Sequence, residues 1–172
     1  MSNEIKNYGI IEGKRESDFI AGTLPYKEIL PLPDWTPYLP TKEKQWFEGG
    51  DTMACVSFSL INSIEMQIKL YTGQEVNFSD RFLAKISGTI RQGNWIYIVA
   101  DTVRKCGLVK EEDWPSPSGI FDWNTYYSEI PQWIKDKAKK WFDDYDLAYE
   151  WVEVNKESLI KHLKHAPLQI VI

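Results

Sequence analysis

The chain reads DTMACVSFS over residues 51–59, where a loop containing a Gly-Gly pair meets a long apolar pattern of helical period. The pattern continues to Tyr71, and Gly73 is a typical helix stop. Its apolar residues cover far more than one stripe, which is typical of a helix buried between other elements. We therefore expect the helix that begins near Cys55 to be the central helix of its domain.

Cys55 stands at the predicted start of that helix. A helix N-terminus carries partial positive charge and amide donors, which favour a thiolate and can stabilise an oxyanion formed beside the sulfur. A cysteine nucleophile needs both features. Taken alone, a cysteine that begins an apolar helix is more often a small buried hydrophobe, so the pattern leaves both interpretations open.

The remaining elements predict an α+β fold with one domain. Residues 1–24 are polar and irregular and are predicted to be an N-terminal extension, so the domain covers residues 25–172. Helices are predicted after Ser79, over 95–106, after Pro131 and after Asn155, with a long loop over 113–128. Strand-like patterns occur only late, at 149–154 and 168–172, and this order of helices before strands is the α+β pattern.

The surroundings of Cys55 resemble the nucleophile region of papain-like cysteine peptidases, in which the cysteine opens a long central helix. Other segments resemble further parts of that family in the correct order: DWTP at 34–37, NFSDRFL at 77–83, the turn and helix from Gly93 to Val109, EDWP at 112–115, and 159–172. The resemblance covers about residues 30–172. It implies a papain-like α+β fold, with a helical half built on the Cys55 helix and the start of a β-rich half.

The resemblance also implies an activity, which is hydrolysis of a peptide or protein substrate through a thioester on Cys55. It implies no metal and no cofactor, and it makes Gly93 and Asn94 the cleft edge that binds substrate. The oxyanion-hole glutamine of the family lies six positions before the nucleophile, where this chain has Gly49. Gln45 lies ten positions before Cys55 and reaches the site only if the loop carries an insertion.

The chain departs from the family pattern at two further points. The half-cystine and glycine before the nucleophile are absent, and Val56 replaces the usual aromatic residue after it. The family spacing puts the catalytic His and Asn at roughly residues 185–205, beyond Ile172. His162 and His165 lie on the helix before the last strand, and we expect both at the surface or rim. The chain therefore lacks a complete triad, and we expect the natural protein to continue past Ile172.

Composition excludes several other classes. The net charge of −5 argues against nucleic-acid binding, which depends on a basic face. No apolar run reaches membrane-spanning length and the N-terminus shows no signal peptide, so we expect a cytoplasmic or virion-associated protein. Cys55 and Cys106 fit neither a disulfide framework nor a metal-ligand spacing, and Cys106 is expected in the core.

Three interpretations remain. The chain is part of an active peptidase whose His and Asn lie past Ile172; or it is a non-catalytic papain-like domain with a binding or structural role, for example in a virus particle; or it is an unrelated helical binding module in which Cys55 is core. The divergent surroundings of Cys55 and the absence of disulfides resemble phage and bacterial members of the family.

Overall fold

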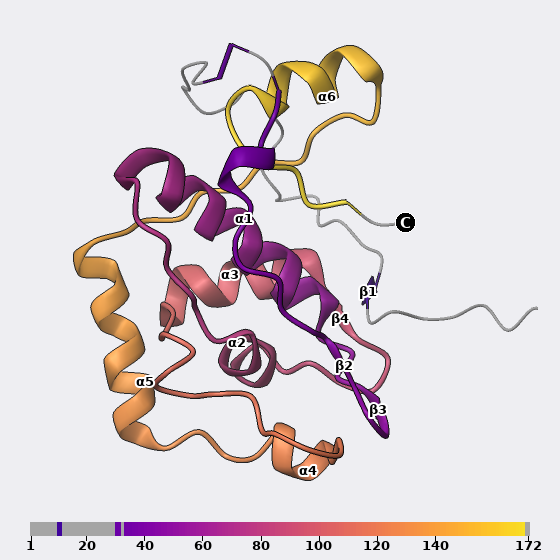
Figure 1. Ribbon diagram of the computed structural model, residues 1–172, viewed down its shortest axis with the longest axis vertical. Helices are drawn as coiled ribbons and strands as arrows, with labels where there is room; N and C mark the ends of the chain where they lie inside the picture. The colour runs from indigo at the N-terminus through magenta and orange to yellow at the C-terminus, as the bar shows by residue number, and fades with distance from the viewer. Residues whose placement is uncertain (1–9, 12–29, 32, 171–172) are drawn as a thin grey trace, which may run out of the picture.

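The computed structural model describes residues 10–11, 30–31 and 33–170. The helix predicted after Cys55 is α1, Cys55–Thr72, and it runs through the middle of the molecule (Figure 1). It ends at Gly73, which has a φ of 71° and whose N–H donates to the Lys69 carbonyl, as expected for a left-handed helix stop. The prediction of a buried central helix is confirmed by the side chains it contributes to the core: Val56, Leu60, Ile61, Ile64 and Ile68.

Two shorter helices pack against α1. The first is α2, Asp80–Ile86, whose start is capped by Ser79 because the Ser79 hydroxyl accepts from the Phe82 amide at 3.1 Å. The second is α3, Ile96–Cys106, which contacts both α1 and α2. The three helices enclose the main core, where Leu83, Val99 and Val103 are fully buried. Cys106, expected in the core, is half-buried.

The α3 helix ends where the chain passes against another helix, α5, Gln132–Lys139. A Cβ built on Gly107 would lie 2.0 Å from the Ala138 carbonyl oxygen, so only glycine fits there. Pro131 stands directly before α5, as predicted, and the 3-10 helix η2, Lys140–Asp143, continues it. The predicted loop over 113–128 also contains a one-turn helix, α4, Trp123–Tyr126, capped by Asp122.

The strands are short and lie near the N-terminal end of α1. An antiparallel hairpin pairs β2, Trp46–Phe47, with β3, Gly50–Asp51. A parallel pair joins β1, Ile10–Ile11, to β4, Asn94–Trp95. Of the predicted extension over residues 1–24, only Ile10 and Ile11 lie within the described residues, and their backbone belongs to this pair.

The last part of the chain corrects one expectation. The helix predicted after Asn155 is present as α6, Lys156–Leu163, with the Asn155 side chain accepting from the Ser158 amide. The strands expected at 149–154 and 168–172 do not form within the described residues, apart from a single bridging residue at Trp151. Alternation alone does not make a strand, because a strand needs a partner ladder. The described contacts of these segments instead include hydrogen bonds from Tyr149 to Asp101 of α3 and from Gln169 to Val56 of α1.

Two contacts tie this last part to the helical half. The Trp35 indole, next to the 3-10 helix η1, Thr36–Tyr38, donates to the Leu163 carbonyl at 2.7 Å. The Gln169 side chain donates to the Val56 carbonyl at 3.0 Å, so the C-terminal segment reaches the first turn of α1. Among the described residues, no helix is long and apolar enough to cross a membrane.

Candidate active site

Cys55 is the first residue of α1, as the sequence predicts. Ala54 precedes it as the N-cap, and its carbonyl accepts from the Ser57 and Phe58 amides. No side chain caps this helix end, so the first amides of α1 remain oriented toward the region of the thiol. The Cys55 side chain is half-buried.

The β2–β3 hairpin brings Gln45 to this helix start. Trp46 pairs with Asp51 and Phe47 pairs with Gly50, so Gln45 faces Thr52 at the base of the hairpin. The Thr52 amide donates to the Gln45 carbonyl at 3.4 Å. A residue that stands ten positions before Cys55 in sequence therefore lies across from a residue only three positions before it. The hairpin therefore places the backbone of Gln45 opposite the segment that leads into α1.

The thiol of Cys55 is not activated in this arrangement. Burial raises its pKa, the negative charge of Asp51 acts in the same direction, and the pKa reaches about 11. The backbone amides of Val56 and of Cys55 itself oppose the shift but do not overcome it. Helix-terminal amides alone are therefore too weak to hold a thiolate here, and a neighbouring cation is needed.

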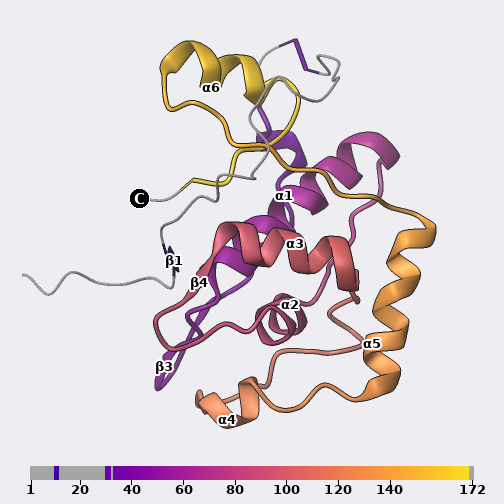
Figure 2. The same ribbon diagram turned by 180° about the vertical axis from the view of Figure 1, so that it is seen from behind.

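Neither histidine supplies that cation. His162 belongs to α6 and His165 follows it, with their rings 6.3 Å apart. In both views α6 lies at the opposite end of the molecule from the β2–β3 hairpin (Figure 2). Both side chains are half-buried, and burial lowers the pKa of His162.

Gly93 and Asn94, the predicted substrate edge, are both buried; Gly93 bridges to Ile90 across a turn, and Asn94 is the first residue of β4. Gly93 has a φ of 103° and exchanges backbone hydrogen bonds with Ile90 at 2.8 and 3.2 Å. The Asn94 amide donates to the Ser87 carbonyl and to the hydroxyls of Ser87 and Thr89. The side chain of Asn94 thus shapes the turn, while its backbone pairs with β1.

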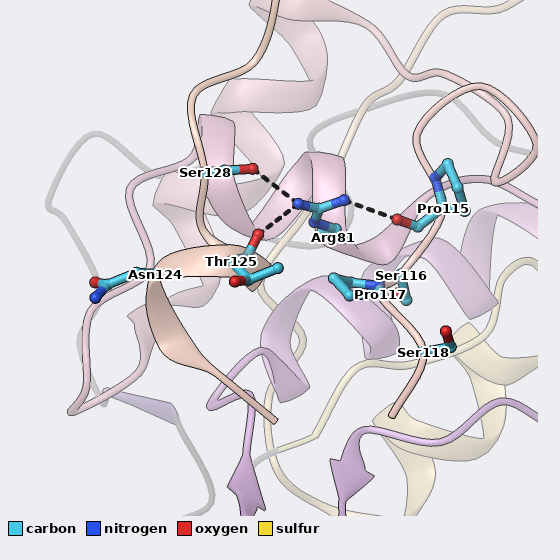
Figure 3. Close-up of a pocket in the computed structure, with 8 residues that line it drawn as sticks. All are labelled: Arg81, Pro115, Ser116, Pro117, Ser118, Asn124, Thr125 and Ser128. Atoms are coloured by element: carbon cyan, nitrogen blue, oxygen red, sulfur yellow. Dashed lines mark hydrogen bonds between the residues drawn. The ribbon is translucent and has the colours of Figure 1, made fainter. Parts of the chain in front are cut away.

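A separate hollow of about 710 Å³ opens beside Arg81 on α2 (Figure 3). The Arg81 guanidinium donates to three backbone carbonyls and one hydroxyl, at 2.6 to 2.9 Å, and the Trp114 ring lies 4.6 Å from it. Because these internal acceptors surround the cation, Arg81 fastens the loop over 113–128 to α2. The lining contains no residue of the hairpin or of α1: Arg81, Pro115, Ser116, Pro117, Ser118, Asn124, Thr125 and Ser128.

The fastened loop has a consequence for the helix start. Tyr127 follows α4 in this loop, and its hydroxyl donates to the Thr52 carbonyl at 2.7 Å. Thr52 is fully buried, and its hydroxyl accepts from the Ala54 amide. Arg81 therefore anchors the loop that carries Tyr127, and Tyr127 fixes the backbone of Thr52, three residues before Cys55. Sequence reasoning missed both residues, because a supporting contact between distant segments leaves no local pattern.

Four carboxyl groups gather around the start of α2, on separate segments. The Phe78 amide donates to Glu65 at 2.7 Å and the Ser116 amide donates to Glu111 at 2.7 Å. Burial raises the pKa of Glu65 to about 8 and raises those of Asp80 and Glu111, with Glu43 adding a like charge. These groups and the other acids, histidines and cysteines of the described residues form no cluster able to hold a metal ion.

No family model matches the sequence, and no curated protein matches it. Among solved structures, xylellain, a cysteine protease from Xylella fastidiosa, superposes with a TM-score of 0.60 at 18% identity, over 91% of this chain and 62% of xylellain. The proform of the ragweed pollen allergen Amb a 11, also a cysteine protease, gives 0.41 at 19% identity, over 64% of this chain and 34% of that one. Digestive procathepsin L 3 of Tenebrio molitor larval midgut gives 0.41 at 18% identity, over 68% and 38%.

The superposition covers 91% of this chain but only 62%, less than two thirds, of xylellain. At 18% identity, the superposition shows the fold alone. The chain has the papain-like α+β fold of cysteine proteases.

Proposed function

We propose that this chain carries the nucleophile of a papain-like cysteine peptidase, with Cys55 as the attacking residue. The observation that supports this most directly is the position of Cys55 at the uncapped first turn of α1, within a papain-like fold. The hairpin strengthens the assignment, because it returns a glutamine to the helix start despite the altered spacing.

The proposed reaction follows from these groups. The Cys55 sulfur attacks the carbonyl carbon of a peptide bond, and the carbonyl oxygen becomes an oxyanion that accepts from the first amides of α1 and from the Gln45 amide. The C–N bond then breaks, the leaving amine takes up a proton, and a thioester remains on Cys55. Water hydrolyses the thioester, which releases the acid and restores the thiol.

The proton in these steps requires a general base that the described site does not show. We propose that a histidine from outside the 172 residues completes it. A histidinium beside the sulfur would lower the pKa of Cys55 from its value of about 11, because an opposite charge favours the thiolate. The Gly93–Asn94 turn would then present its backbone to a peptide substrate once β1 has left β4.

A second function deserves the same test. The raised pKa of Cys55 and the distance of α6 from the hairpin also fit a papain-like domain without catalysis, used for binding or as a structural part, for example of a virus particle. In that case Cys55 persists as a half-buried side chain packed against the main core.

The test is the rate at which a limiting peptide epoxide modifies the native chain, followed by intact mass and peptide mapping. Cys106 is the internal control, since it is also half-buried but ends α3. Modification of Cys55 much faster than that of free cysteine supports the peptidase and shows that a base is present. With a pKa of about 11, only about one thiol in ten thousand is ionised at pH 7, so without a base Cys55 reacts more slowly than free cysteine.

The Cys55→Ser variant shows that the adduct forms at this residue. If the slow result persists in the longest natural form of the protein, the peptidase proposal is wrong and the non-catalytic domain stands.

A further inference from the structure

One oxygen atom of Asp51 holds two groups at the base of the hairpin. Asp51 Oδ1 accepts from the Gln45 Nε2 amide at 2.8 Å and from the Met53 backbone amide at 2.7 Å. Asp51 itself lies in β3, paired with Trp46, so its backbone is fixed by the hairpin. The carboxylate therefore ties the side chain of Gln45 to the segment that leads into α1.

Each of the two contacts has a specific effect. An ionised carboxylate can only accept hydrogen bonds, so the contact turns the nitrogen end of the Gln45 amide toward Asp51 and fixes which end faces which way. The Met53 contact spans two residues, as in an Asx turn, and Met53 has a φ of 58°, which is unfavourable for a residue with a side chain. Asp51 thus supports a strained turn two residues before Cys55.

We propose that Asp51 is the positioning residue of this site, holding the Gln45 amide and the Met53 turn in the arrangement that an oxyanion donor needs. The part of this inference that assigns Gln45 to the oxyanion rests on the proposed function. The part that assigns the holding of Gln45 to Asp51 rests on the two hydrogen bonds and the hairpin register alone.

The negative charge of Asp51 also acts on the Cys55 thiol, and this effect can be measured. The negative charge of the same carboxylate raises the pKa of Cys55. Among the described residues, the Tyr127 phenol also lies near the thiol, and burial raises its pKa, so it stays neutral over the working range. Asn in place of Asp51 keeps an acceptor oxygen but removes the charge, whereas Ala removes both. The two substitutions therefore separate holding from charge.

The first measurement is hydrogen exchange and chemical shift of the Gln45 side-chain amide by NMR in the 172-residue chain. Asp51→Ala is expected to speed exchange of the Gln45 side-chain amide by about tenfold, because that amide loses its hydrogen bond to a charged carboxylate. Asp51→Asn is expected to stay within about twofold of the parent, which shows rescue by the acceptor. Glu48→Gln is the matched control, since it removes a negative charge from the exposed tip of the same hairpin.

The second measurement is the pH dependence of Cys55 alkylation by iodoacetamide. Asp51→Asn is expected to move the rise of the rate to lower pH, and Glu48→Gln is expected to leave it in place. This shift reports the charge of Asp51 near the thiol and not its hold on Gln45; an unchanged profile in Asp51→Asn would show that the charge does not act on Cys55.

The third measurement is the equilibrium binding of acetyl-Phe-glycinal, a peptide aldehyde. The Cys55 sulfur adds to the aldehyde carbon, and the thiol proton moves to the aldehyde oxygen, so nothing leaves and no base is consumed. The resulting oxygen lies where the oxyanion would form. Gln45→Ala and Asp51→Ala are each expected to weaken binding by about tenfold or more, and Asp51→Asn by less than about twofold.

The outcomes distinguish the positioning role of Asp51 from the oxyanion-binding role of Gln45. If Asp51→Ala leaves the Gln45 amide as protected as in the parent, the positioning role is overturned whatever the aldehyde does. If the Gln45 amide is loosened but neither alanine variant weakens the aldehyde, Asp51 keeps its positioning role and the oxyanion assignment of Gln45 fails. If Gln45→Ala weakens the aldehyde and Asp51→Ala does not, the proposed function keeps its donor and the positioning of Asp51 is wrong.

Discussion

At the scale of single residues, Glu65 couples folding to pH. It is 4% exposed, and burial raises its pKa from 4.5 to about 8. In the unfolded chain Glu65 ionises near pH 4.5, while the folded chain keeps its proton until about pH 8. The unfolded state therefore binds fewer protons in this window, and stability falls as pH rises through it and levels off above it.

We expect Glu65→Gln to flatten this fall, because Gln keeps an acceptor for the Phe78 amide and does not ionise. Between pH 5 and 8, the substitution is expected to remove a decrease on the order of a few kcal/mol in the free energy of unfolding, measured by urea denaturation. Asp80 and Glu111 shift in the same direction and preserve part of the slope. Glu112→Gln, at an exposed ion pair with Lys110, is the control; equal slopes in parent and Glu65→Gln would contradict the assignment.

The sequence is informative about residues that act through local geometry. Cys55 was identified because a helix start, a loop and an apolar pattern meet at it, and the structure places it at that helix start. Gln45 was selected only on condition of an insertion, and the structure places its backbone across from Thr52. Its role in binding an oxyanion stays a prediction, as does substrate binding at Gly93 and Asn94. Asp51 and Arg81 were not identified, because their partners are set by the fold and not by spacing.

At the scale of elements, the junction of α3 and α5 depends on a glycine, Gly107, at the end of α3. Gly107 has a φ of 71°, and a Cβ there would lie 2.0 Å from the Ala138 carbonyl oxygen. Gly73 has the same φ of 71° at the end of α1 but nothing within 4 Å of the corresponding position. The two glycines therefore share φ but differ in contact and in ψ, which is 0° at Gly73 and −166° at Gly107.

Gly73→Ala is expected to lower the free energy of unfolding by about 1 kcal/mol, the cost of a left-handed residue with a side chain. Gly107→Ala is expected to cost at least about 2 kcal/mol more, because its combination of φ and ψ is essentially confined to glycine and because α5 must move away from the end of α3. Urea denaturation of both variants measures the difference. Similar losses for the two would show that both the contact with Ala138 and the backbone at Gly107 relax without cost.

Elements with strong end signals were predictable, and those that depend on distant partners were not. Ser79, Pro131, Asn155 and the glycines after α1 and α3 marked helix limits that the structure confirms. The four-residue α4 was missed because Asp122 caps it inside a loop rich in Pro and Ser. The strands expected near the C-terminus did not form in the described residues, since alternation indicates which face is buried but not which partner pairs.

At the scale of the whole molecule, the N-terminal and central parts of the chain meet at the predicted substrate edge. Ile10 pairs with Asn94 and Ile11 with Trp95 in a parallel ladder. A peptide that uses the backbone of this edge must first displace β1. We therefore expect removal of residues 1–11 to tighten acetyl-Phe-glycinal binding several-fold, because the cost of releasing β1 disappears.

Removal of residues 1–8 is the matched control, because it leaves both strand residues of β1 in the chain. Affinity is read from the change in intrinsic Trp fluorescence on titration. If both deletions bind the aldehyde like the parent, β1 does not compete with the ligand and the substrate edge lies elsewhere.

The β2–β3 hairpin has a consequence for how such chains diverge. Residues can be added to a hairpin two at a time, one to each strand, without changing which residues face each other at its base. The separation between Gln45 and Cys55 along the chain is therefore free to grow in steps of two while the pairing of Gln45 with Thr52 stays the same. A search pattern with a fixed interval before the cysteine would pass over every chain lengthened in this way, whereas one that permits even-numbered insertions between the two residues would retrieve it.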